Sequence, residues 1–258
     1  MRLRQNRFLL LFLVIAVILV FCWPAYSYAQ PVQIPEVNLQ IGGEGDEDPE
    51  SLVGFLQLLL VMALLTLAPA FVILTTSFTR IVIVLSFTRN AMATQQIPPN
   101  QVIIGLALFL TFFVMQPTLA QINETAVQPY LEGEIEQEAA LSIGAEPLKS
   151  FMYYHTRERD LALFVNMSGM EQPETQSDVP LHVLVPAFVI SELKTAFQMG
   201  FMLYVPFLVV DMVVASTLMS MGMFMLPPVI VSMPFKLLLF ILVDGWHLVV
   251  RSLLESFN

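Results

Sequence analysis

The chain has 258 residues, of which 57% are hydrophobic and only 12% are charged, and its formal net charge is −10. Soluble domains usually carry about a quarter charged residues, so this composition indicates a membrane protein and argues against a soluble enzyme. The acidic balance argues against nucleic-acid binding, because phosphate neutralisation needs a basic surface, and the single cysteine, Cys22, excludes a disulfide within the chain.

The first 29 residues have the pattern of a secretory signal peptide. Arg2, Arg4 and Arg7 precede an uncharged apolar stretch over residues 8–23, and small residues stand before Ala29. We therefore expect cleavage after Ala29; a retained first transmembrane helix is the alternative.

Residues 30–51 follow as an acidic segment. They contain six acids and no base, a composition that buries too little apolar surface to order itself, so we expect an exposed tail. The acids Asp46, Asp48 and Glu50 alternate, but the glycine and the final glutamate of a calcium loop are missing, so no metal site is expected here.

Two long uncharged stretches come next, over residues 51–79 and 90–123. Each exceeds the roughly 20 residues that a helix needs to cross a bilayer. We predict a first helical hairpin over residues 52–119, with a kink at Pro69 and the end of its second helix at Pro117.

The connection inside this hairpin carries Arg80 and Arg89, followed by a turn at Pro98 and Pro99. Positively charged connections belong in the cytoplasm, so the first helix should run inward and the second outward. The region after the hairpin is then expected on the external side.

Residues 120–180 form that external region and contain 11 acids and three bases. Apolar residues at helical spacing predict one amphipathic helix over residues 147–167. His155 lies close to Arg157 and Arg159, which would disfavour its charged form, and we interpret it as a packed or surface histidine.

Residues 181–258 are predicted to form a second helical hairpin. Each charge at membrane depth costs about 2–3 kcal/mol, so such residues normally have partners. In an antiparallel arrangement Asp211 lies level with Lys236, whereas Glu192 and Asp244 find no base opposite. Their partners would have to come from another helix or another subunit, which is a first reason to expect an oligomer.

The turn of the second hairpin is rich in methionine. Met219, Met221, Met223 and Met225 alternate with other residues, and two prolines then end the regular helix. Methionine is unbranched and adaptable, so a ring of such side chains could close a pore and still deform around a passing chain. Gap-filling residues in a tight turn are the alternative, and composition leaves both readings open.

Three stretches resemble the FliP/SctR family of type III secretion export-gate subunits. They read "TTSFTRIVIVLSFTRNAMATQQIPPNQVIIGLALFLTFFVMQP" at 75–117, "RERDLALF" at 157–164, and "PAFVISELKTAFQMGFMLYVPFLVVDMVVASTLMSMGMFMLPPVIVSMPFKLLLFILVDGW" at 186–246. Members of the SctR virulence branch generally lack so long a signal and tail region, which favours the flagellar branch.

The resemblance implies an all-α subunit of a helical pore complex in the bacterial inner membrane, at the flagellar basal body. It implies five copies of the chain assembled with FliQ and FliR, associated with FlhB, and a channel for unfolded flagellar proteins. Members are inserted as membrane proteins, but the resemblance also implies that their helices end up largely outside the bilayer plane.

The resemblance also assigns roles to individual residues. It implies that Met223, Phe224 and Met225 form the pore constriction, with Phe224 standing where many members have a methionine. It further implies an acid–base contact between subunits through Glu192 and Lys236. This contact competes with the Asp211–Lys236 pair, and we favour it because Glu192 otherwise lacks a nearby base. The complete set of candidate subunit-contact or buried charges is Glu192, Lys236, Asp211, Asp244, Lys194, Arg80 and Arg89.

No catalytic motif accompanies these features. The sequence has no phosphate-binding G-x-x-x-x-G-K-[ST] loop, and His155, His182 and His247 are scattered, so we expect no enzyme activity, no cofactor and no metal. An ion-coupled transporter with a relay of the buried charges is the rival from another class. It predicts an internal repeat of the two hairpins, and the two connections do not resemble each other.

Overall fold

The computed structural model describes residues 49–94, 96–170, 173 and 175–257, and every regular element within them is helical, as the long apolar runs and the resemblance predict. The predicted signal peptide and most of the acidic tail lie outside the described residues. The chain divides into two units, residues 1–63 and 64–258, which are considered separately.

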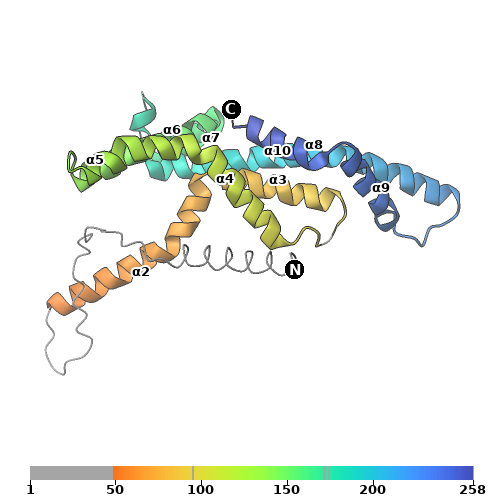
Figure 1. The fold of residues 1–258 in the computed structure, drawn as a ribbon, viewed down its shortest axis with the longest axis horizontal. Helices are drawn as coiled ribbons and strands as arrows, with labels where there is room; N and C mark the ends of the chain where they lie inside the picture. The colour runs from red at the N-terminus through yellow and green to blue at the C-terminus, as the bar shows by residue number, and fades with distance from the viewer. Residues whose placement is uncertain (1–48, 95, 171–172, 174, 258) are drawn as a thin grey trace, which may run out of the picture. The chain divides into compact units, whose positions relative to one another are not determined.

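Helix α2 (Pro49–Thr75) extends across the division between the units and continues through Pro69 (Figure 1). Its stretch from Gly54 to Thr75 is long and apolar enough to cross a membrane, and almost none of it is buried within the chain. This matches the first predicted span. The aliphatic side chains along it are available to lipid or to other proteins.

Helices α3 (Phe78–Ala91) and α4 (Asn100–Ile122) follow, so the expected short connection contains a helix of its own. Arg80 and Arg89 therefore stand toward opposite ends of α3 rather than together in one loop. The predicted end at Pro117 is wrong, because α4 continues to Ile122 and into a π-helical turn. A proline removes only one backbone donor, and the remaining helical hydrogen bonds carry the helix past it.

Helix α8 (Leu181–Ser220) is 40 residues long, about 60 Å at 1.5 Å per residue. It packs along α3 over a core that contains the fully buried Ile81, Val84 and Leu85. Gly200 permits the close approach of the two helices, because a Cβ atom there would lie 2.6 Å from the ring of Phe87. Helices α3 and α8, which lie in two of the stretches that carry the family resemblance, are thus joined by one packed interface.

Residues 120–180, predicted to form a helical region, are helical as expected, but the main helix is divided. These residues contain a π-helical turn η1 (Asn123–Val127), α5 (Gln128–Leu131), α6 (Gln137–His155), α7 (Glu158–Ser168) and a short 3₁₀ turn η2 (Gln176–Asp178). The single helix predicted over 147–167 is wrong, because Thr156 and Arg157 have extended backbone. The backbone N–H of Arg157 donates instead to the Ser191 hydroxyl of α8, at 3.1 Å. A contact distant in sequence therefore interrupts a locally regular helix.

Helices α9 (Pro228–Leu242) and α10 (Gly245–Glu255) complete the second hairpin. Helix α9 packs back against α8, as predicted. The second arm of the predicted hairpin was expected as one helix over residues 226–250. In the structure the two final helices are bent by 64° relative to each other at residues 243–244.

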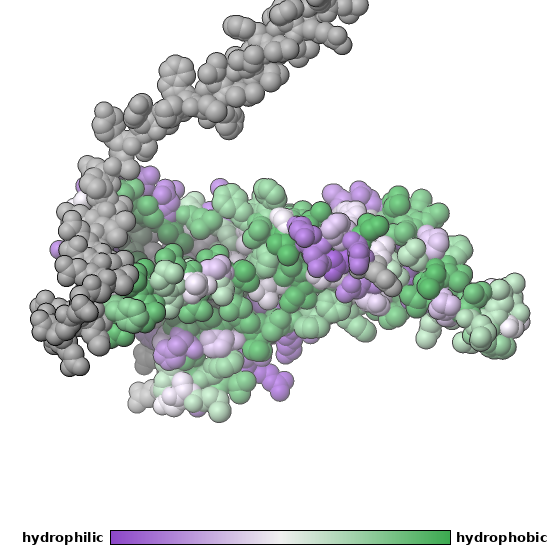
Figure 2. Space-filling model, turned by 90° about the horizontal axis from the view of Figure 1, so that it is seen from below, coloured by the Kyte–Doolittle hydropathy of each residue, from purple (hydrophilic) through white to green (hydrophobic). Residues whose placement is uncertain are grey.

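Among the described residues, three helices are long and apolar enough to cross a membrane, or four if α9 and α10 count as one broken span. Figure 2 shows apolar residues covering most of the visible face. Large apolar side chains on α4, including Phe109, Phe112 and Phe113, are exposed in the isolated chain. Surfaces of this kind mark contact with lipid or with other subunits.

Candidate functional site

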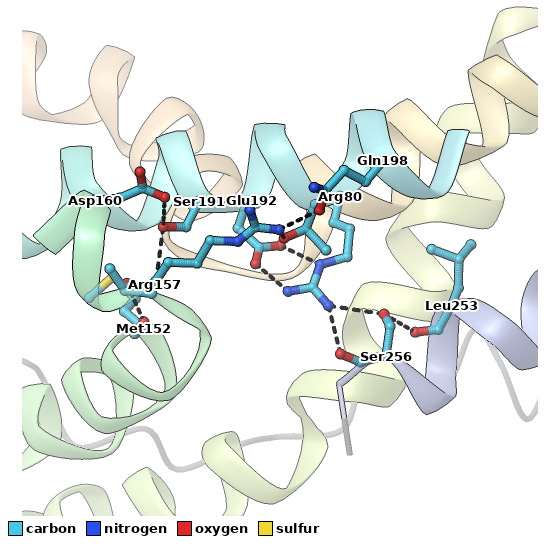
Figure 3. Close-up of polar contacts among 11 residues, drawn as sticks. Arg80, Met152, Arg157, Asp160, Ser191, Glu192, Gln198, Leu253 and Ser256 are labelled. Carbon is cyan, nitrogen blue, oxygen red and sulfur yellow. Dashed lines mark hydrogen bonds and ion pairs between the residues drawn. The ribbon is translucent and has the colours of Figure 1, made fainter. Parts of the chain in front are cut away.

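A buried ion pair between Arg80 and Glu192 joins α3 to α8. The Arg80 Nε donates to Glu192 Oε2 at 2.9 Å, and its Nη2 donates to Glu192 Oε1, so the contact is bidentate. Both side chains are almost completely buried, and Figure 3 shows them facing each other between the helices. The planar guanidinium fits a carboxylate in this geometry better than a lysine would.

The remaining donor of the same guanidinium extends the network. The Arg80 Nη1 donates to the backbone oxygen of Ser256 at 2.7 Å and to its hydroxyl at 2.9 Å. The Phe257 ring lies over the guanidinium carbon, 3.9 Å from the ring centroid, a favourable cation–π arrangement. One arginine thus connects α3, α8 and the segment that follows α10.

The expectation that Glu192 lacks a nearby base within its chain is therefore wrong. Hairpin register compares only residues on the two arms of one hairpin, and Arg80 lies 112 residues earlier in the sequence. The reason for favouring a Glu192–Lys236 contact is removed, because each of these residues has a partner in its own chain. A subunit-contact role for either charge stays a prediction.

The second pair lies within the second hairpin. The Lys236 Nζ donates to Asp211 Oδ2 at 2.7 Å, and the Ser232 hydroxyl donates to Asp211 Oδ1. Lys236 is buried, while about a fifth of the Asp211 side chain is exposed. The level placement of these two residues, predicted from the hairpin register, is confirmed.

The other candidate charges are not brought together. Lys194 and Asp244 are exposed on α8 and before α10, and Arg89 hydrogen-bonds the loop at Pro98 and Asn100. No relay of buried charges therefore links Asp244 to the two pairs. Within the residues described, no group of three histidine, cysteine, aspartate or glutamate side chains could hold a metal ion.

A further polar contact, centred on Ser191, is absent from the sequence-based set. The Ser191 hydroxyl donates to Asp160 Oδ2 at 2.9 Å, and the Arg157 guanidinium donates to Thr195 and Gln198 on α8 (Figure 3). Arg157 and Asp160 belong to the short "RERDLALF" stretch that carries the family resemblance, and this stretch was the sequence feature that could have pointed to them. These contacts attach α7 and the residue before it to the part of α8 that carries Glu192.

The methionine-rich turn connects α8 to α9 and presents its side chains outward. Met223, Phe224 and Met225 are 41%, 77% and 96% exposed in the isolated chain. Gly222 has a φ of 75°, which permits the reversal after α8. The three side chains have no core to fill within the chain, so the gap-filling alternative lacks support from this turn.

His155 lies at the end of α6 among aromatic rings. Its ring centroid is 4.7 Å from that of Phe151 and 5.3 Å from that of Phe257. Burial, together with the positive charge of Arg80, lowers the pKa of His155 from 6.5 to about 4. The expected direction was right, although the charge responsible is Arg80 rather than Arg157 or Arg159.

This pKa predicts a pH dependence of stability. Between about pH 6.5 and pH 4 the unfolded chain binds a proton at His155 that the folded chain does not, so the contribution of His155 to stability should fall as the pH is lowered through this range. Replacement by phenylalanine should weaken the dependence, measured as the difference in unfolding temperature between pH 7 and pH 4.5. The control is H182Q, at an exposed histidine; an unchanged slope in H155F would contradict the assignment.

Comparisons with known proteins match most of the chain to one family. The family model described as the FliP family matches residues 61–253. The chain belongs to the FliP family. Proteins named flagellar biosynthetic protein FliP are 59% identical in Bacillus subtilis, over 81% of this chain and 95% of the relative, and 49% identical in Caulobacter vibrioides, over 95% and 89%. A third, from Aquifex aeolicus, is 48% identical over 88% of this chain and 93% of its own length.

Both charge pairs and the methionine-rich turn fall inside the segment that the FliP family model matches. The long apolar helices of this FliP-family chain are those of a membrane protein. The family match therefore covers both ion pairs and the turn, while Ser256 and Phe257 lie just after it and the predicted signal peptide and acidic tail precede it.

The Asp211–Lys236 pair in this FliP-family chain can be tested by charge reversal. K236E should place two acids together and destabilise the fold by about 3–5 kcal/mol, the usual effect of breaking a buried pair. Adding D211K should recover most of the loss, because the two side chains contact each other. Thermal unfolding would measure the stability of each variant, and gel filtration in detergent would measure its state of association. Recovery by E192K instead of D211K would contradict pairing inside the hairpin.

Proposed function

We propose that this chain is a core subunit of the flagellar type III protein export gate. It forms the pore through which unfolded flagellar proteins leave the cell during flagellum assembly. The observation that carries the proposal is the match to relatives named flagellar biosynthetic protein FliP over most of the chain. The proposed location is the bacterial inner membrane at the flagellar basal body.

The assembly we propose contains five copies of the chain together with FliQ and FliR, associated with FlhB. The uncovered apolar faces of α2 and α4 support an assembly, because a single soluble copy would expose them to water. The two ion pairs within the chain also support an assembly. Because each charge already has a partner, the helices can pack against neighbouring subunits without burying an isolated ion.

Passive gating is the proposed mechanism. The turn residues Met223, Phe224 and Met225 from all copies would form an apolar constriction that excludes water and ions until an unfolded chain displaces it. The chain supplies the channel and no chemical step, and the energy for export comes from other components. The transporter alternative is not supported, because the two acids of α8, Glu192 and Asp211, are each bound to a base.

The test is genetic complementation in the organism of origin. Deletion of the gene should abolish swimming and the release of flagellar proteins into the medium, and a plasmid copy should restore both. R251A, which removes only an exposed ion pair, is the matched control and should restore them fully. Native mass spectrometry of the extracted complex should give five copies. Normal secretion of flagellar proteins in the deletion strain would contradict the proposal.

A further inference from the structure

Two opposite charges in the second hairpin have no partner among the residues that the structure describes. Residues 181–257 contain seven acidic or basic side chains. Five of them form ion pairs: Glu192 with Arg80, Asp211 with Lys236, and Arg251 with Glu255. Lys194 and Asp244 form no ion pair and no side-chain hydrogen bond with any described residue. Within this described part of the chain, one base and one acid therefore stay unpaired.

Both unpaired charges lie on apolar surfaces. Lys194 is exposed on α8, inside a stretch long and apolar enough to cross a membrane, and the exposed Phe197 and Phe201 follow it on the same face of the helix. Asp244 is exposed at the bend between α9 and α10, and the exposed Ile241 lies one turn before it. When lipid or protein covers such a surface, the charge is left in apolar surroundings, which is unfavourable unless an opposite charge meets it.

The two charges are too far apart to pair within one chain. Phe207 contacts Phe240 with ring centroids 6.3 Å apart, which sets the register of α8 and α9 one turn before the bend. In this register Asp244 lies near the level of Leu203, which is about 14 Å along α8 from Lys194. A lysine and an aspartate side chain do not span this distance. Pairing therefore requires a second molecule.

A second copy of the chain carries both halves of the missing contact. Each copy has one free base and one free acid at different places, so copies arranged head to tail form the same contact at every junction. A different partner would have to supply an acid for Lys194 and a base for Asp244 separately. The exposed apolar side chains beside both charges supply the area that such a junction buries.

We propose that Lys194 of one copy pairs with Asp244 of the next copy in the assembled complex. The pair sets the register between neighbours, because complementary charges select one orientation and penalise others. Since Asp244 lies level with Leu203 rather than with Lys194, neighbouring copies are displaced along α8 relative to each other. This inference rests on the proposed function and deepens it by naming a contact between the copies.

Cross-linking between two differently tagged copies tests the contact directly. Cys22 is replaced by serine in both copies, and K194C in one and D244C in the other are expressed together in the deletion strain. Membranes are treated with a bifunctional thiol reagent about as long as an extended lysine side chain. We expect a dimer that carries both tags, about tenfold more abundant than with M212C in place of K194C, because adjacent thiols react at a high effective concentration.

Two further positions on α8 control for proximity alone. Met212 is the matched control, because it is exposed, lies about five turns from Lys194 on the same face of α8, and is about as far from the level of Asp244 in the opposite direction. F201C lies close to that level and reports copies that are not displaced. Stronger cross-linking of D244C to F201C or M212C than to K194C would overturn the proposal.

Charge reversal tests the electrostatic part of the contact. K194E should lower the fraction of the chain in the assembled complex about tenfold, because two acids then meet at each junction. Adding D244K should restore the complex, whereas adding E255K, at another exposed acid, should not. Native mass spectrometry of the extracted complex would measure the fraction. No recovery in K194E/D244K, or equal recovery in K194E/E255K, would overturn the pair.

These results are separable from the test of the proposed function. If the deletion strain fails to swim and to release flagellar proteins but the cross-link is absent, the contact is wrong and the proposed function stands. If the deletion strain secretes normally, the proposed function is wrong, and a cross-link between Lys194 and Asp244 positions would still support the contact between copies.

Discussion

Replacing Arg80 by alanine should lower the free energy of unfolding by about 3–5 kcal/mol, one of the largest effects expected for a single residue in this chain. The substitution leaves the Glu192 carboxylate buried without its bidentate partner and removes both hydrogen bonds to Ser256. Unfolding of the purified protein in mixed micelles, followed by helical circular dichroism during an SDS titration, would measure the loss.

A double-mutant cycle identifies the cause. The pair R80M and E192L together should cost much less than either change alone, because removing both charges leaves no buried ion uncompensated. R251A breaks an exposed pair of similar length and should cost under about 1 kcal/mol. Additive losses in the double variant would show that the two side chains do not stabilise each other.

If the proposed gating is right, replacing Met223, Phe224 and Met225 together by glycine should open a leak for small ions, with membrane conductance rising on the order of tenfold as the proposed apolar constriction is removed. The three side chains are exposed in the isolated chain, so their loss should leave the helices of the chain intact. Ion flux would be measured in vesicles that contain the assembled complex.

Variants with different side chains at these three positions distinguish the effect of side-chain size from the effect of polarity. Leucine at all three positions should keep the seal closed, whereas serine should leak as glycine does, because the seal depends on excluding water rather than on sulfur. M167A, at an exposed methionine on α7, is the matched control and should not leak. A tight membrane in the glycine variant would remove these residues from the seal.

Several features follow directly from the order of residues. Long uncharged apolar runs are a local property, so the helical fold and the membrane character could be predicted without any contact information. The Asp211–Lys236 pair could also be predicted from the sequence, because the position of one turn near Met223 determines which residues of α8 and α9 lie at the same level. The family could be recognised because its characteristic stretches are continuous in sequence.

Other features depend on contacts between distant segments. The partner of Glu192 is on α3, the break at Thr156 coincides with a hydrogen bond to Ser191, and the bend before α10 places Gly245 against Phe240. Local pattern favoured an unpaired acid and two continuous helices at these places. By itself the sequence determined which segments are helical and apolar. Only the tertiary structure decided which charges meet and where helices bend, because packing brings together residues that are far apart in the sequence, and a buried charge or polar group must find its partner among them.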